Sequence, residues 1–331
     1  MQQNPTNVEA GRRQPPPHPG LGLVRATESA ALAAGRWMGM GDRQAADHAA
    51  QDAMAEALGF MPMCGRVVSG EELRVGEHSR LDSGAPCGSG KGPELDVEVN
   101  AIDGASLVAE GRPGAISVAA FAPPGAMWNP APAVYMEKLV VGRKAASALG
   151  PEALDAPPGW TLALVARQMG KDIRDLVVFI LERSRHESLI QEVRRAGARV
   201  FLRPAGDIAG AIMTADPEGG IDLMLGVGGA SEGLLAACAV KALGGAMLAR
   251  VAPQDEDERR ACAEAELDLS RVLTCEDMVA GNDVFFTATG ITDTTLLRGV
   301  RYHGDYVDTQ SLVLRMDTGT RRLISTEHRL K

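Results

Sequence analysis

The chain has 331 residues, of which 45% are apolar and 23% charged, and its formal net charge is −9. This length suits two domains or one large domain, and the composition is that of an ordinary globular protein. The negative charge argues against binding to nucleic acid or to an anionic membrane surface, because both select basic proteins.

The first half of the chain predicts a disordered tail followed by helices and strands. Residues 1–20 are rich in Pro, Gln and Asn, which is typical of disorder. Alanine-rich segments predict two helices, alternating apolar residues predict a strand that ends at Asn100, and another strand begins at Ala115. The helices are expected at 23–38 and 43–58 and the strands at 67–68, 95–100 and 115–123.

The second half alternates regularly between predicted helices and strands. Helices are expected at 161–169, 186–196, 207–214, 231–243 and 254–270, and strands at 176–181, 198–202 and 221–225. This rhythm predicts a largely parallel sheet with helices on both faces, and residues 311–329 predict a terminal hairpin. Because residues 142–160 are rich in Gly and Pro, we expect three parts: the tail 1–20, an α+β subdomain at 21–155 and an α/β subdomain at 156–331.

Cysteine usage and hydropathy indicate where the protein works. The five cysteines contain no C-x-x-C pair, which indicates reduced thiols and not a disulfide framework or a zinc site. No stretch approaches 18 consecutive apolar residues, and the N-terminus has no apolar signal-peptide segment. We therefore expect a cytoplasmic protein.

A glycine-rich segment, GVGGASEG at 226–233, lies between a predicted strand and a predicted helix. Backbone N–H groups at such a helix start can cradle a phosphate. Ser231 stands where a third glycine of a dinucleotide-binding fingerprint belongs, and no acidic residue follows at the ribose distance. A nucleotide site is therefore not expected, and Glu232 is either a ligand or a partner of the helix dipole.

Acidic residues occur at several predicted element ends. Asp42 and Asp47 flank the start of a helix, Glu71 and Glu72 lie in a loop after a strand, and Asp103 follows another strand. Helix capping, a solvated loop and a turn before glycine explain each of these taken alone. Together they lie where α/β proteins place ligand sites.

Basic and aromatic residues supply a second set of candidates. Arg183 and Arg185 could clamp a phosphate or form a solvated pair. His186 fits either a helix start or a base, and Tyr135 is a core residue by default.

Seven segments in order resemble the class II fructose-1,6-bisphosphatases, which belong to the larger superfamily of inositol monophosphatases. The resemblance runs from Val24 to Arg322 and rests on these segments: ATESAALAAGRWMGMGDRQAAD, VSGEE, NAIDGA, YMEKLVVG, ILERSRHE, GVGGASEG and NDVFFTATGIT. It implies a layered sugar-phosphatase sandwich of two α/β subdomains. It also implies hydrolysis of fructose 1,6-bisphosphate, or of sedoheptulose 1,7-bisphosphate in photosynthetic relatives, assisted by Mg²⁺ or Mn²⁺.

The resemblance also assigns roles to individual residues. The metal ligands it implies are Asp47, Glu71, Asn100, Asp103 and Glu232. The substrate contacts it implies are Tyr135, Arg183, Arg185, Asp207 and Gly229. Asp103 and Asn100 fall at the catalytic positions of the family motif, and Ala105 stands at the position of the family's catalytic threonine.

The sequence departs from the family pattern at the centre of the site. The motif D-P-I-E-G-T is here Asn100 to Ala105, so an amide replaces a metal carboxylate and a methyl replaces the water-orienting hydroxyl. Arg74 or Val75 stands where the family has the aspartate that pairs with that hydroxyl. General-base assistance is typically worth about 10²–10⁴ in rate, so these losses predict weakened catalysis.

Two functions are consistent with these residues. The first is a class II fructose-bisphosphatase with weakened activity that releases fructose 6-phosphate and phosphate. The second is a catalytically inactive paralogue that binds sugar phosphate or an active sister subunit as a regulator. Both take a sugar bisphosphate as the small-molecule partner, and we expect a homo-oligomer.

Overall fold

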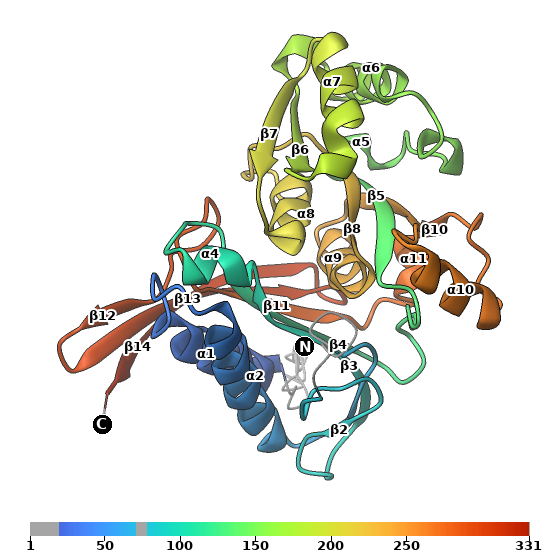
Figure 1. Cartoon of the computed structure of the whole chain (residues 1–331). Helices are drawn as coiled ribbons and strands as arrows, with labels where there is room; N and C mark the ends of the chain where they lie inside the picture. Colours follow the sequence, from blue (N-terminus) through green and yellow to red (C-terminus); the bar gives the residue numbers. More distant parts are fainter. Residues whose placement is uncertain (1–19, 71–77, 331) are drawn as a thin grey trace, which may run out of the picture.

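The computed structural model describes residues 20–70 and 78–330 as two β-sheets that alternate with three layers of helices (Figure 1). The predicted tail 1–20 lies outside this range except for Gly20, which begins the first helix. The predicted ligand Glu71 also lies outside the described residues. The longer helices are α1 Gly20–Gly35, α2 Arg43–Gly59, α6 Pro158–Met169, α7 Glu187–Arg195, α8 Asp207–Ala215, α9 Ala230–Ala242 and α10 Glu256–Glu264. The shorter ones are α4 Ala105–Ala109, α5 Arg143–Ala146 and α11 Cys275–Met278.

The first sheet has eight strands. Seven of them follow the order β12-β13-β11-β4-β3-β1-β2, and the eighth, β14, pairs with β13. Its strands are β1 Cys64–Val67, β2 Pro86–Cys87, β3 Glu94–Asp103, β4 Ile116–Ala122, β11 Phe285–Gly290, β12 Arg301–His303, β13 Tyr306–Arg315 and β14 Thr320–Arg329. β13 and β14 form the predicted C-terminal hairpin.

The second sheet has six strands in the order β10-β9-β5-β8-β6-β7. They are β5 Tyr135–Val141, β6 Val177–Leu181, β7 Arg199–Arg203, β8 Leu223–Gly229, β9 Ala246–Val251 and β10 Leu273–Thr274. β6 pairs in parallel with β7 and β8, but β5 is antiparallel to β8 and β9, and β9 is antiparallel to β10. The prediction of a largely parallel sheet was therefore wrong, because three of the five pairings are antiparallel.

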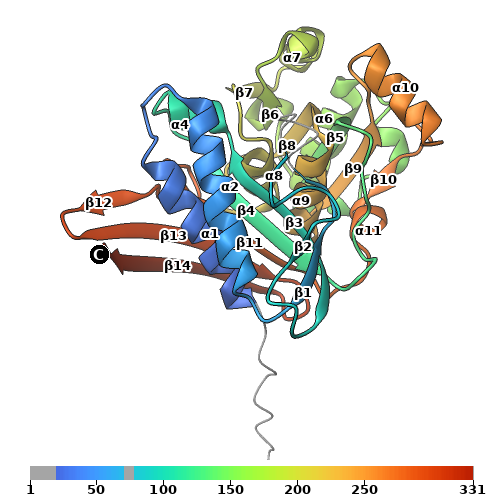
Figure 2. The ribbon, with the colours of Figure 1, turned by 60° about the horizontal axis from the view of Figure 1, so that its bottom comes forward.

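The layers follow from which strand faces are apolar. In β4 the side chains of Val118 and Ala120 belong to the core cluster that contains α8 and α9, whereas Ala119 and Phe121 belong to the cluster that contains α1 and α2. Figure 2 shows α1 and α2 lying across the face of the first sheet. All seven β4 residues are buried, as expected for a strand covered on both faces. The helices α8 and α9 lie between the two sheets, and α5, α6 and α7 cover the far face of the second sheet. This order of layers confirms the predicted sugar-phosphatase sandwich.

Several element boundaries differ from their predictions: α1 spans Gly20–Gly35 and not 23–38, and β8 continues to Gly229 and does not end at residue 225. β3 does not end at Asn100 but continues through Asp103, with an irregularity in its pairing to β4 between those residues. The acidic helix predicted at 254–270 is shorter, because α10 ends at Glu264 and Glu266 has a positive φ of 54°.

Sheet membership does not follow the expected boundary at residue 155. β5 belongs to the second sheet although it precedes that residue, and β11 to β14 return to the first sheet. No helix in the described part of the chain is long and apolar enough to cross a membrane.

Candidate functional site

A polar cleft with a volume of about 270 Å³ lies where the two sheets meet. The ends of β3 and β6 and the starts of β5, α4, α8 and α9 supply its walls. Its lining residues are Arg43, Asp103, Gly104, Ala105, Ser106, Val134, Tyr135, Leu181, Arg183, Arg185, Ala205, Gly206, Asp207, Gly228, Gly229 and Glu232. Eight positions singled out from the sequence therefore share one cleft: Asp103, Ala105, Tyr135, Arg183, Arg185, Asp207, Gly229 and Glu232.

Asp103 joins the first sheet to a helix of the interior layer. Its side chain is 4% exposed, and its Oδ2 accepts hydrogen bonds from the backbone N–H groups of Ile208 and Ala209, both at 3.1 Å. These groups belong to the first turn of α8, where a carboxylate is stabilised by the helix dipole. The next residue, Gly104, has a φ of 95°, which allows the chain to turn directly into α4.

Asn100 lies below the cleft, on the face of β3 that points to the interior layer. Its side chain is 2% exposed, and its Oδ1 has no hydrogen-bond partner among the described residues. A buried amide oxygen without a partner costs about 1–3 kcal/mol, so this position favours a cation or a donor that would use the oxygen.

Glu232 lies in the first turn of α9 and is 7% exposed. The hydroxyl of Ser231 donates to its Oε2 at 3.2 Å. A Cβ at Gly229 would lie 1.7 Å from that same oxygen, so only glycine leaves room for the carboxylate in this position. The glycine-rich segment therefore shapes the cleft at a helix start, as its sequence suggested.

Asp207 forms an ion pair with Lys138, a lysine of β5 whose side chain has no exposed surface. The carboxylate reaches the cleft, and its Oδ1 is buried without a hydrogen-bond partner among the described residues. A Cβ at Gly228 would lie 2.1 Å from Asp207 Oδ2, so this glycine also makes room for an acidic side chain. Asp207 is thus held as a charged acceptor in the wall of the cleft.

Arg183 and Arg185 give this acidic protein a locally positive wall. Both are exposed and line the cleft, and the guanidinium of Arg185 lies 5.1 Å from the centre of the Tyr135 ring. Arg185 also donates from Nη2 to the carbonyl of Val227 at 2.9 Å. The ring of Tyr135 therefore binds the guanidinium of Arg185 through a cation–π contact. Tyr135 lies in the wall of the cleft and not in the core, where a tyrosine is expected by default.

His186 is a structural link and not a base. Its Nδ1 donates to the carbonyl of Leu181 at 2.7 Å, and its Nε2 accepts from the N–H of Val227 at 2.8 Å. Burial lowers the pKa of this imidazole below its usual value, and the neighbouring Arg185 lowers it further. Both nitrogens of the neutral ring are hydrogen-bonded, and these two bonds hold the loop that carries Arg183 and Arg185 next to β8.

We expect His186 to make folding stability depend on pH. Because its pKa is lowered in the folded protein, the unfolded chain binds the proton first, and stability falls as the pH drops below about 6.5. The contribution between pH 7 and pH 5 is at most about 2 kcal/mol. In urea unfolding, His186→Leu should lower stability at pH 7 and make the loss toward pH 5 shallower. Equal slopes in the parent protein and in the variant would exclude this role.

Two of the sequence-derived metal positions within the described residues, Asn100 and Asp47, do not line the cleft. Asp47 is 6% exposed in α2 and lies 3.7 Å from Nε of Arg43, which does line the cleft. Its neighbour Asp42 caps α2 by accepting from the N–H of Ala45 at 2.9 Å, as its position before the helix suggested.

The residues present fit a hard divalent cation in their chemistry, although the described set is small. Within residues 20–70 and 78–330, no three His, Cys, Asp or Glu side chains come together to hold a metal ion. Asp103 and Glu232 nevertheless share the cleft, and the partnerless Oδ1 of Asn100 adds an oxygen of the type that Mg²⁺ prefers. The donor set is therefore all oxygen and carries less charge than the family pattern implies.

Three residues of the site were not singled out from the sequence. Arg43 and Ser106 line the cleft, and Lys138 lies behind it. The signal for Lys138 was available, because a lysine in the middle of the apolar strand YMEKLVV needs a buried partner. Arg43 and Ser106 carry no such signal, since each lies in the first turn of a helix, where an ordinary solvated polar residue would look the same.

Comparison with known proteins gives a consistent result across the chain. A family profile described as bacterial fructose-1,6-bisphosphatase, glpX-encoded, matches residues 19–328. The chain is 38% identical to the class 2 fructose-1,6-bisphosphatase of Haemophilus influenzae, covering 92% of this chain and 94% of that protein. It is also 36% identical to proteins from two Synechococcus strains, JA-3-3Ab and JA-2-3B'a(2-13). Both are named D-fructose 1,6-bisphosphatase class 2/sedoheptulose 1,7-bisphosphatase. Each match covers 93% of this chain and 95% of the relative.

Proposed function

Because the chain belongs to the class II fructose-1,6-bisphosphatase family, we propose that it hydrolyses fructose 1,6-bisphosphate to fructose 6-phosphate and phosphate. The observation that carries this proposal is the polar cleft, whose lining contains both an arginine pair and the carboxylates of Asp103 and Glu232. Phosphate needs cationic donors, and its hydrolysis needs oxygen ligands for a cation, so the two sets suit the two ends of one substrate.

The substrate is bound mainly by residues of the second sheet. Arg183 and Arg185 bind the phosphate that is not cleaved, because planar guanidinium groups match phosphate oxygens in pairs. Asp207 accepts a hydrogen bond from a sugar hydroxyl, and the ring of Tyr135 keeps Arg185 in place. The N–H groups near Gly229, at the start of α9, bind phosphate oxygens.

The cofactor is Mg²⁺ or Mn²⁺. Asp103, Glu232 and Asn100 would hold it, with Asp47 and Glu71 as further ligands. When bound, such a cation neutralises phosphate charge and acidifies water. Ala105 offers no hydroxyl to orient that water and Asn100 offers no charge, so we propose a turnover weaker than that of relatives with the full motif.

The charge and the cysteines of the chain bear on where the protein works in the cell. We propose a cytoplasmic enzyme, since all five cysteines are free thiols and the net charge of −9 suits a freely dissolved metabolic protein. We also propose a homo-oligomer that binds neither nucleic acid nor a membrane.

Phosphate release from fructose 1,6-bisphosphate, with Mg²⁺ or Mn²⁺ added, tests the activity directly. Release should exceed a metal-only blank, and a parallel assay with sedoheptulose 1,7-bisphosphate distinguishes six- from seven-carbon substrates. Release no greater than the blank with both substrates would refute the proposal.

Removing a cleft arginine should weaken substrate binding. Arg185→Gln should raise KM about 10- to 100-fold, since hydrogen bonds to a charged group contribute about 1.5–3 kcal/mol each. Arg194→Gln, at an exposed arginine of α7, is the matched control and should leave KM unchanged. Equal KM values in both variants would remove Arg185 from the binding site.

A further inference from the structure

A second cavity with a volume of about 280 Å³ lies behind the loop that joins β7 to α8. It is bounded by the first sheet, by β6, β7 and α8 of the second half, and by the loop after β11. Its lining residues are Pro113, Gly114, Ile116, Phe179, Phe201, Arg203, Ala205, Gly206, Ala209, Ile212, Met213, Asp293, Thr294, Thr295, Leu296, Leu297 and Leu312. Only Ala205 and Gly206 also line the polar cleft.

The interior of this cavity suits an aromatic ring. Phe179 and Phe201 form one wall, with ring centres 6.2 Å apart and planes tilted by 43°, and Met213 lies in another wall. An apolar cavity of roughly 150 Å³ is enough to bind benzene, so this one has room for a larger ring system. An apolar pocket with a few polar groups at its edge is the usual form of a small-molecule site.

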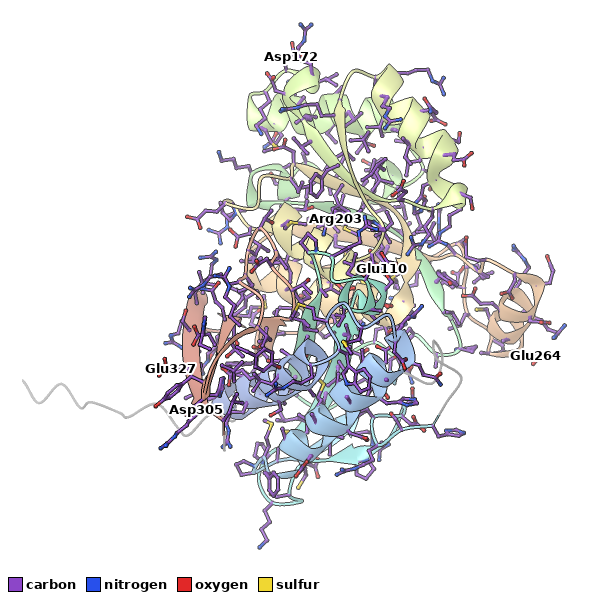
Figure 3. The ribbon with its side chains drawn as sticks, turned by 60° about the vertical axis from the view of Figure 1, so that its left-hand side comes forward. Glu110, Asp172, Arg203, Glu264, Asp305 and Glu327 are labelled. Carbon is purple, nitrogen blue, oxygen red and sulfur yellow. The ribbon has the colours of Figure 1, made fainter. Side chains whose placement is uncertain are left out.

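Arg203 gives the cavity one positive charge that no described carboxylate neutralises. Its guanidinium donates to the carbonyl of Pro113 and lies 5.9 Å from the centre of the Phe201 ring. Gly114, with a φ of 124°, leaves room for it, because a Cβ there would lie 2.0 Å from its Nη2. Arg203 is partly exposed, and in the view of Figure 3 it projects near the centre of the molecule.

The acidic residue at the cavity edge has partners of its own. Asp293 accepts from the N–H of Gly299 at 2.9 Å and lies 3.4 Å from the guanidinium of Arg301. The charge that faces an occupant is therefore that of Arg203. An anionic group complements it, and the apolar walls select against a sugar.

We propose that this cavity binds a small planar aromatic anion, with its ring between the phenylalanines and Met213 and its negative group at Arg203. The site differs from the polar cleft in chemistry, since its walls are mainly apolar with Arg203 and Asp293 as the charged residues, whereas several charged side chains line the polar cleft.

The loop between the two cavities couples them. Ala209 lines the second cavity with its side chain, while its N–H donates to Asp103 in the polar cleft. Gly206 contacts both cavities, and the next residue, Asp207, carries the ion pair with Lys138. An occupant that shifts the start of α8 therefore shifts Asp103 and Asp207, which makes the cavity a regulatory site; this regulatory role rests on the proposed function, whereas the binding itself does not.

Titration with 1-anilinonaphthalene-8-sulfonate, an aromatic anion, tests the binding. The folded protein should show saturable fluorescence with one site per chain and a Kd in the micromolar range. Met213→Trp, which fills the cavity, and Arg203→Met, which removes the charge, should each weaken binding at least 10-fold. Arg199→Met, at the other end of the same strand, should not. Circular dichroism of each variant must match that of the parent protein.

A neutral analogue separates the role of the charge from that of the walls. N-phenyl-1-naphthylamine lacks the sulfonate and should bind at least 10-fold more weakly than the anion, with no further loss in Arg203→Met. Binding of the anion that is unsaturable, or equal in the parent protein and Met213→Trp, would overturn the proposal.

The regulatory role is measured on the affinity for fructose 1,6-bisphosphate by calorimetry, with and without saturating sulfonate. A change of at least threefold that disappears in Met213→Trp supports coupling, and an unchanged affinity rejects it. If the sugar bisphosphate does not bind at all, the proposed function fails and the regulatory role fails with it. The proposal that the cavity binds an aromatic anion is tested by the two titrations alone and does not depend on the sugar bisphosphate.

Discussion

Replacing Lys138 by methionine is expected to lower the free energy of unfolding by about 3–5 kcal/mol, the usual cost of breaking a buried ion pair from one side. Methionine keeps the length of the side chain but leaves Asp207 as a buried carboxylate without its cation. The Oδ1 of Asp207 has no other described hydrogen-bond partner that could compensate for the loss. Urea unfolding measures the effect, and Lys144→Met, at an exposed lysine of α5, should change stability by less than about 0.5 kcal/mol.

The double variant Lys138→Met with Asp207→Asn tests whether the ion pair is the cause. Removing both charges should cost less than the sum of the two single changes, because neither charge is then left alone in the interior. Strictly additive losses would show that Lys138 stabilises the protein by packing next to Gly233 and not through Asp207.

The binding data should separate these roles further. If Lys138 also keeps Asp207 in position for a sugar hydroxyl, Lys138→Met should raise KM, and it should raise it no further in the Asp207→Asn background. A purely structural lysine would lower the amount of folded protein without changing the KM of the folded fraction.

The elements of the fold could be read from local patterns, but the strand order could not. The periodicity of residues 176–214 gave the positions of β6, α7, β7 and α8 to within a few residues. The same alternation suggested parallel strands, yet β5 enters the second sheet from before the presumed connection and runs antiparallel to β8. Which strands pair depends on which edge strand of a sheet is still unpaired when a distant segment reaches it. The pattern of apolar residues within one segment does not contain this information.

Some residues of the cleft could be predicted from the local sequence pattern and others could not. Asp103 and Glu232 were singled out because they lie at element ends, and the ends of β3, β6 and β8 do meet at one cleft. The bonds of Asp103 to the start of α8 could not be foreseen, because they span 105 and 106 residues of chain. Lys138 was missed although it lies inside an apolar strand, because its partner Asp207 is 69 residues away in the chain and no local pattern links the two.

Restoring the family motif at two positions is expected to raise turnover by about 10²–10⁴, the range that a positioned general base contributes. Asn100→Asp is nearly isosteric and returns a negative charge to a buried oxygen that has no described partner. Ala105 is 5% exposed and lines the cleft, so a threonine there would bring its hydroxyl to the proposed water position. Phosphate release from fructose 1,6-bisphosphate with Mn²⁺ measures the gain in kcat.

A matched variant isolates the hydroxyl. Asn100→Asp with Ala105→Val adds the same volume without the oxygen and should remain at least 10-fold slower than the threonine double variant. Equal rates for valine and threonine would show that the gain comes from the charge alone.

Stability gives an independent measure of the metal site. Without a divalent cation, Asn100→Asp buries an uncompensated carboxylate and should lower the thermal midpoint of the protein. Added Mn²⁺ should recover that loss in the aspartate variant and raise the midpoint of the parent protein less, because the stabilisation by a ligand grows with the ratio of its concentration to its Kd and the aspartate should lower that Kd. Should Mn²⁺ shift both proteins equally, Asn100 lies outside the metal site and the weakness of the catalytic centre has to be sought at Ala105 alone.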